Sequence, residues 1–249
     1  MSSSPTATAS TTRSSISSGS RTDTPALAVI ACGALAGPVR DIVARRDWPV
    51  EVHPLPAVLH NRPERIAPAV AELAATLQAR GLRVALGYAD CGSYGALDKL
   101  CGRLGVTRLR GLHCYDVLGG ADRVRALLAR EPGTYLLTDF LVRSFRTTVL
   151  AGLGLDRHPE LWADYFGHYR RLVWLAQDRA AGLEERASEI AGFFGLPLRI
   201  IDVGTGSLER ELELMLSSVT RTRPASEPGG RAQARIRAHG ALPQATSSA

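Results

Sequence analysis

The chain has 249 residues, of which 45% are hydrophobic and 22% charged, so it can bury a full core and disorder of the whole chain is excluded. The formal net charge of +6 is concentrated at the two ends. Residues 218–249 hold five Arg and one Glu, and residues 1–24 hold two Arg and one Asp, which leaves only +1 for the remainder. A body this close to neutral does not support a nucleic-acid-binding surface.

The sequence predicts a soluble cytoplasmic protein with no membrane association. The first 24 residues are rich in Ser and Thr and lack the apolar region of a secretory signal. No later stretch approaches the roughly 18 uninterrupted apolar residues of a membrane-spanning helix. Four scattered cysteines do not make a disulfide framework, which favours a reducing compartment.

Composition also predicts the domain organisation. Residues 1–24 are expected to form a disordered leader, because Ser, Thr and Gly at this density cannot bury enough apolar surface to offset chain entropy. Residues 25–217 are expected to form a single α/β domain, and residues 218–249 a disordered Arg-rich tail.

Short apolar runs alternate with helical patterns along the body of the chain. The strands are expected at residues 27–31, 50–53, 84–86, 106–109, 135–137 and 198–203. The helices between them are expected to end near residues 46, 80, 104 and 130, and a last helix to cover 207–216. This order predicts a doubly wound, mostly parallel sheet of about six strands.

Beyond Leu141 the pattern indicates several helices and no obvious strand, so a helical insertion is expected before the last strand. Trp162, Tyr165, Phe166 and Tyr169 recur at helical spacing there and are expected to face the core.

Three cysteines follow predicted strands at the turns that end them, namely Cys32, Cys91 and Cys114. The carboxyl ends of parallel strands are where such sheets bind ligands. Three thiolates suit a zinc ion or a four-iron four-sulfur cluster with one open coordination position. The alternative is that each is a small buried hydrophobe. Cys101 lies on the apolar face of a predicted helix and is expected to be a core residue.

The loop after the second strand is rich in polar and rigid residues. His60, Asn61, Arg62 and Arg65 are candidates for binding a carboxylate or phosphate, because guanidinium groups match such anions with two parallel hydrogen bonds. The alternative is a solvated loop in which the arginines pair with Glu64 and its neighbours.

Three further residues are candidates for acid or base catalysis. His113, beside Cys114, can serve as a general base, a metal ligand or a hydrogen-bond donor to a ligating thiolate. Asp90 and Asp139 end predicted strands and can face the same crevice, although capping of the following helix is the simpler role for both.

Several phrases together resemble the bacterial and archaeal family catalogued as domain of unknown function 1638, over roughly residues 26–216. They lie at residues 31–33, 59–66, 90–92, 111–115, 133–141 and 154–161. The resemblance implies no particular reaction. Some members of that family are encoded near corrinoid-dependent methyl-transfer systems, which implies a place in one-carbon metabolism.

The leading hypothesis is a metalloenzyme that acts on a small anionic substrate at the three-cysteine site, with zinc or an iron-sulfur cluster as Lewis acid. A second hypothesis is a non-enzymatic accessory or carrier protein that serves a corrinoid methyl-transfer partner by binding corrinoid or delivering metal. A third is an anion-binding module without metal.

Overall fold

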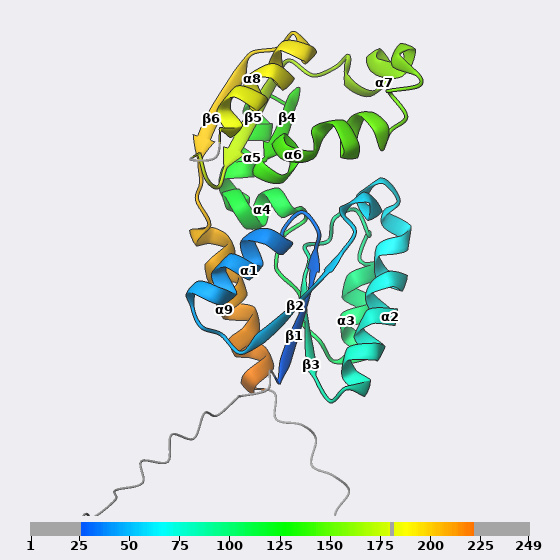
Figure 1. The fold of residues 1–249 in the computed structure, drawn as a ribbon, viewed down its shortest axis with the longest axis vertical. Coiled ribbons are helices and arrows are strands. Elements are labelled where there is room, and N and C mark those ends of the chain that lie inside the picture. The colour runs from blue at the N-terminus through cyan, green and yellow to red at the C-terminus, as the bar shows by residue number, and fades with distance from the viewer. Residues whose placement is uncertain (1–25, 180–181, 222–249) are drawn as a thin grey trace, which may run out of the picture.

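The computed structural model describes residues 26–179 and 182–221, so the expected leader and all but the first residues of the expected tail lie outside it. The α/β class and the parallel strands are confirmed. The prediction of one six-stranded sheet is wrong, because the strands form two separate parallel sheets of three strands each. Figure 1 shows them in two lobes, one above the other.

Lobe A comprises residues 26–118 and 206–221 and is built on the sheet β2-β1-β3. Its strands are β1 (Leu27–Cys32), β2 (Val50–Leu55) and β3 (Arg83–Gly87). Two helices lie on each side of the sheet (Figure 1), α1 (Ala36–Arg45) and α9 (Gly206–Arg221) on one side, α2 (Ile66–Ala79) and α3 (Ala96–Leu104) on the other. Every residue of the central strand β1 is buried, as expected for a parallel strand covered on both faces.

Lobe B comprises residues 121–179 and 182–203 and is built on the sheet β4-β5-β6. Its strands are β4 (Thr134–Thr138), β5 (Arg171–Ala176) and β6 (Leu198–Asp202). Helix α5 (Ala121–Arg130) packs on one face, and α6 (Asp139–Phe145) and α8 (Leu183–Phe194) pack on the other. A π-helix η3 (Arg146–Ala151), a 3-10 turn η4 (Pro159–Leu161) and the short α7 (Trp162–Phe166) connect α6 to β5.

The prediction of a purely helical insertion is wrong, because this segment contains β5, the central strand of lobe B. The run from Leu172 to Ala176 is fully buried, but a short apolar run bears no periodicity that separates a buried strand from a helix. Of the expected aromatic stripe, Phe166 is buried in the core, whereas Tyr165 is 42% exposed.

The expected strand at 106–109 is reduced to one isolated parallel bridge, between Leu86 and Arg108. Leu86 exchanges backbone hydrogen bonds with Thr107 and Leu109, and the chain then turns away at Gly111, whose φ is +119°. The helix expected to follow, ending near residue 130, is divided at Gly119 and Gly120 into α4 (Cys114–Gly119) and α5.

The chain passes between the lobes at two adjacent places, at Gly119–Gly120 and between β6 and α9. After β6 the chain returns to lobe A, where α9 packs against α1, β3 and α4 (Figure 1). Gly120 and Gly204 have φ values of +84° and +58°, which favour glycine at both crossings.

Asp139 anchors β4 to β5 and gives a test of this architecture. Its buried carboxylate accepts hydrogen bonds from Trp174 Nε1 at 2.9 Å and from the backbone N–H groups of Gln177 and Asp178 at 3.0 and 2.8 Å. Replacement by Ala leaves these donors without this acceptor, so Asp139→Ala is expected to lower the free energy of unfolding by about 3 kcal/mol. Urea denaturation measures it. The control Asp122→Ala removes an exposed carboxylate and should change stability by less than about 0.5 kcal/mol.

Candidate functional site

Three loops at the carboxyl edge of sheet A meet beside lobe B. They are the turn after β1 with Cys32, the turn after β3 with Cys91, and the segment that enters α4 with Cys114. Backbone hydrogen bonds join the last two, from Asp90 N–H to the Gly111 carbonyl at 3.1 Å and from Cys91 N–H to the Leu112 carbonyl at 2.8 Å. Cys32 and Cys91 therefore lie at the ends of neighbouring strands, and Cys114 lies in the segment that follows the isolated bridge at Arg108.

The three thiols lie within one another's electrostatic field. Burial raises the pKa of Cys32 to about 11. Burial also raises the pKa of Cys91, and the charge of an ionised Cys32 adds to this effect, which brings the value to about 12. Burial raises the pKa of Cys114 well above its usual value, and Cys32 and Cys91 raise it further. The Cys114 backbone N–H also donates to the Cys91 thiol. All three cysteines are therefore neutral thiols at pH 7 when no ligand is bound to them.

Cys101 is placed apart from this group. It is buried in α3, and the charged groups that affect its pKa are Arg108 and Asp98 and not the other thiols. The expectation that it belongs to the core is confirmed.

His60 contacts the most deeply buried thiol. Its Nδ1 is 2.8 Å from the Ala57 carbonyl oxygen, which can only accept, so Nδ1 carries the proton. In the neutral ring Nε2 is then an acceptor, and it lies 3.6 Å from Cys32 Sγ. The thiol donates to His60, which is thus placed to take the proton if Cys32 becomes a thiolate.

Gly33 makes this contact possible. A Cβ at position 33 would lie 2.6 Å from the Leu55 carbonyl oxygen and 2.8 Å from the Ala57 nitrogen, closer than real side-chain carbons approach backbone. Only glycine lets the turn after β1 lie against the turn after β2, which brings His60 to Cys32.

Tyr88 is the site residue that sequence analysis missed. It is fully buried, and its hydroxyl has no hydrogen-bond partner in the described structure. Burial raises its pKa, and the charges of ionised Cys32 and Cys91 raise it further. It stacks with His60 at a centroid separation of 6.4 Å. A buried hydroxyl without a partner costs free energy and indicates a missing acceptor.

A cavity of about 410 Å³ lies between the lobes and is lined by Cys91 and Cys114. Lobe A also contributes His60, Asn61 and His113, and lobe B contributes a mostly apolar wall with three hydroxyl-bearing side chains. That wall consists of Tyr135, Thr138, Phe140, Leu141, Thr148, Val149, Leu153 and Phe166. Cys32 is fully buried and reaches the cavity wall through His60.

Other expected site residues take different positions. Asn61 lines the cavity and donates to the Gly152 carbonyl at 3.2 Å, which links the two lobes. Arg62 and Arg65 are exposed and do not line the cavity. Their role in binding an anion stays a prediction.

The two carboxylates have structural contacts. Asp90 accepts hydrogen bonds from the Ser93 hydroxyl and from the backbone N–H groups of Tyr94 and Gly95, at 2.8, 3.1 and 2.9 Å. These bonds and the charge of Arg108 hold the pKa of Asp90 below its usual value, against the effect of burial. Asp139 is the anchor described above. These contacts favour the simpler structural role for both, and a catalytic role stays a prediction.

Among residues 26–179 and 182–221, all four cysteines are free, and no group of three or more His, Cys, Asp or Glu side chains is arranged to hold a metal ion. In the same residues no helix is long and apolar enough to cross a membrane.

Fold and site together define a two-lobed α/β protein with two cysteines, Cys91 and Cys114, in the lining of an interlobe cavity. The family model described as protein of unknown function (DUF1638) matches residues 54–212, well over half of the chain. The chain belongs to this family, as its sequence phrases predict, although the match begins later than the expected residue 26 and leaves Cys32 outside it. Neither a curated protein nor a solved structure matches the chain.

The backbone at Cys91 gives a second prediction. Its φ of +52° is in the left-handed region, which costs a non-glycine residue about 1 kcal/mol. The unfolding free energy of Cys91→Gly should therefore exceed that of Cys91→Ala by about that amount, although both variants lose the thiol. Urea denaturation under reducing conditions measures the difference. Equal stabilities would show that the turn relaxes when the thiol is removed.

Burial of Cys32 gives a pH dependence. The unfolded chain releases this thiol proton near pH 8.5, whereas the folded protein holds it to about pH 11. The resulting stabilisation is complete below pH 8.5 and is lost as the pH rises to 11. Between these values the unfolding free energy should fall more steeply in the wild type than in Cys32→Ala, by about 1.4 kcal/mol per pH unit. Denaturation at several pH values with reductant and chelator tests this, and parallel profiles would contradict it.

Proposed function

We propose that the chain is an iron-sulfur enzyme in which Cys32, Cys91 and Cys114 hold a four-iron four-sulfur cluster at the floor of the interlobe cavity. One observation carries the proposal: Cys91 and Cys114 line the same cavity, and in the described structure the fully buried Tyr88 hydroxyl, which stacks with the His60 that contacts Cys32, has no hydrogen-bond partner. A core of small hydrophobes does not explain the cost of that hydroxyl.

The chemistry of the donor set suits a cluster, and a single zinc ion with the same three thiolates is the alternative. A cluster distributes its thiolates over different irons, and three of them leave one iron open. That iron would supply Lewis acidity toward a substrate. The Tyr88 hydroxyl would donate its free hydrogen to the bound group.

The surrounding residues have distinct roles in this proposal. His60 accepts the Cys32 proton when the thiolate forms, because its Nε2 faces the sulfur. His113 is exposed at the cavity and is the candidate acid or base for the substrate. The substrate is a small anionic molecule, for which Arg62 and Arg65 remain candidate partners outside the cavity lining. A reducing cytoplasmic location would keep the free thiols available.

The cavity favours an enzyme over an accessory or carrier protein of a corrinoid methyl-transfer system. A carrier needs only ligands and a docking surface. Here both lobes contribute to a space of about 410 Å³ next to two of the thiols, which is large enough for a small substrate.

Anaerobic reconstitution with ferrous iron and sulfide tests the proposal. The wild type is expected to bind about four iron and four sulfide per chain, with a broad visible absorption and a paramagnetic signal after reduction. Each of Cys32→Ala, Cys91→Ala and Cys114→Ala should lose most of this cluster.

Cys101→Ala is the matched control, because it removes a buried thiol from the same lobe and should retain the full cluster. The proposal would be overturned if the wild type took up no iron, or if Cys101→Ala lost as much as the other variants. Stoichiometric zinc in place of iron would show that the site holds a single ion.

A further inference from the structure

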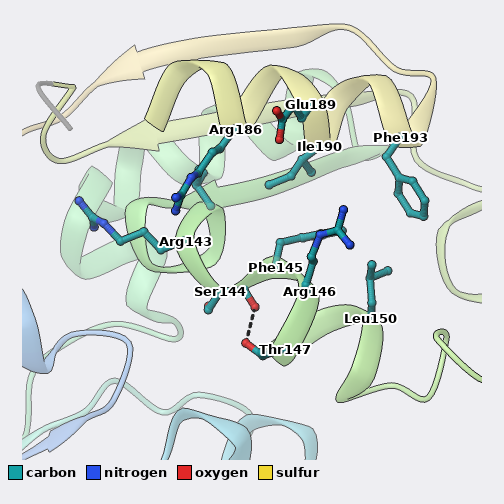
Figure 2. Close-up of a pocket in the computed structure, with 11 residues that line it drawn as sticks. Arg143, Ser144, Phe145, Arg146, Thr147, Leu150, Arg186, Glu189, Ile190 and Phe193 are labelled. Atoms are coloured by element: carbon teal, nitrogen blue, oxygen red, sulfur yellow. Dashed lines mark hydrogen bonds between the residues drawn. The ribbon is translucent and has the colours of Figure 1, made fainter. Parts of the chain in front are cut away.

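Lobe B has a second cavity, of about 450 Å³, on the face formed by α6, η3 and α8. Figure 2 shows the side chains around it. It shares no lining residue with the interlobe cavity, so it can bind a ligand independently of the thiol site.

Three arginines line this cavity, Arg143 from α6, Arg146 from η3 and Arg186 from α8. All three are exposed, and none has a hydrogen bond or ion pair to another residue in the described part of the chain. In the same lobe Glu184, at the start of α8, is paired with Arg179 instead. Within the residues that the structure describes, three guanidinium groups are therefore gathered without hydrogen-bond or ion-pair partners.

The charges in the cavity favour an anion with more than one negative charge. Glu189 is the only carboxylate among the lining residues, so three cations stand against one anion. Like charges gathered in one cavity repel one another, and an anion that accepts bidentate hydrogen bonds from guanidinium groups relieves this repulsion. Phosphate groups have the geometry and charge for such bonds.

An aromatic side chain lies at the other end of the cavity. Phe193 is 59% exposed, although it packs edge-to-face on Trp162 at a centroid separation of 4.8 Å and on Phe145 at 6.5 Å. In Figure 2 Arg146 lies between Phe193 and the pair formed by Arg143 and Arg186. A fixed, exposed aromatic ring is a surface on which a planar ring can stack.

We propose that this cavity binds a nucleoside di- or triphosphate. The phosphates bind Arg186 and Arg146, with Arg143 at the outer end, and the base stacks on Phe193. Its volume falls within the range of sites for molecules of this size. The proposal does not rest on the iron-sulfur site, and its test involves no iron.

Calorimetric titration of the full chain with ADP, pyrophosphate and adenosine at low salt tests the proposal. ADP is expected to bind most tightly, pyrophosphate more weakly, and adenosine weakest. Arg186→Ala and Arg146→Ala should each weaken ADP binding about tenfold or more, since each loses a charge-assisted hydrogen bond. Arg186→Lys should restore little, because an ammonium cannot form two parallel bonds.

Two variants separate phosphate recognition from base recognition and from net charge. Phe193→Ala should weaken ADP binding and leave pyrophosphate binding unchanged. Arg199→Ala removes an exposed positive charge on β6, outside the cavity, and should leave ADP binding unchanged. Thermal unfolding of each variant checks that it is folded.

Absence of ADP binding by the wild type would overturn the proposal. Equal losses of ADP affinity in Arg186→Ala and Arg199→Ala would also overturn it, because they would show a charge effect that is not specific to the cavity. Equal affinities for ADP and pyrophosphate, unaffected by Phe193→Ala, would overturn the nucleotide assignment and leave a phosphate site.

Discussion

Desolvation of three thiols at one edge of sheet A is the constraint on which the rest of the site depends. A thiolate in this position has no nearby cation among its described neighbours, so the pKa values of Cys32, Cys91 and Cys114 all rise and the thiols stay neutral. Such thiols are poor nucleophiles at pH 7. In the proposed iron-sulfur site, the irons supply the positive charge that stabilises the thiolates.

The two-lobed arrangement divides the cavity into walls of different chemistry. Lobe A contributes thiols and imidazoles, whereas lobe B contributes apolar and aromatic surface with the hydroxyls of Tyr135, Thr138 and Thr148. The lobes are joined by two crossings with glycines at positive φ, and Asn61 bonds to Gly152 across the cavity. The size of the cavity thus depends on how the lobes are held together, because neither lobe encloses it alone.

Sequence patterns placed β1, β2, β3, β4 and β6 to within two residues, but they missed β5, placed a strand at 106–109 where only one bridge forms, and could not predict how the strands assemble. Cys32 and Cys91 follow short buried runs bounded by turns, and that signal is local. Whether residues 135–137 join the first sheet or begin a second depends on their pairing with β5. The sequence does not reveal β5, because its short apolar run has no periodicity that identifies a strand. Tyr88 was missed because a tyrosine after a buried strand is an ordinary core residue, and only the structure reveals its unpaired hydroxyl.

Coupling between protons and a bound cationic group follows from the same desolvation. Three thiols that keep their protons to high pH must release them when they become ligands, so uptake of such a group is linked to the release of as many as three protons. One proton has an acceptor in place, because His60 Nε2 faces Cys32 and its Nδ1 proton is held by the Ala57 carbonyl. Cys91 and Cys114 line the cavity, so their protons can leave through it. In the proposed iron-sulfur site, the fully buried thiol of Cys32 thus has its own base, and His60 acts in the assembly of the site.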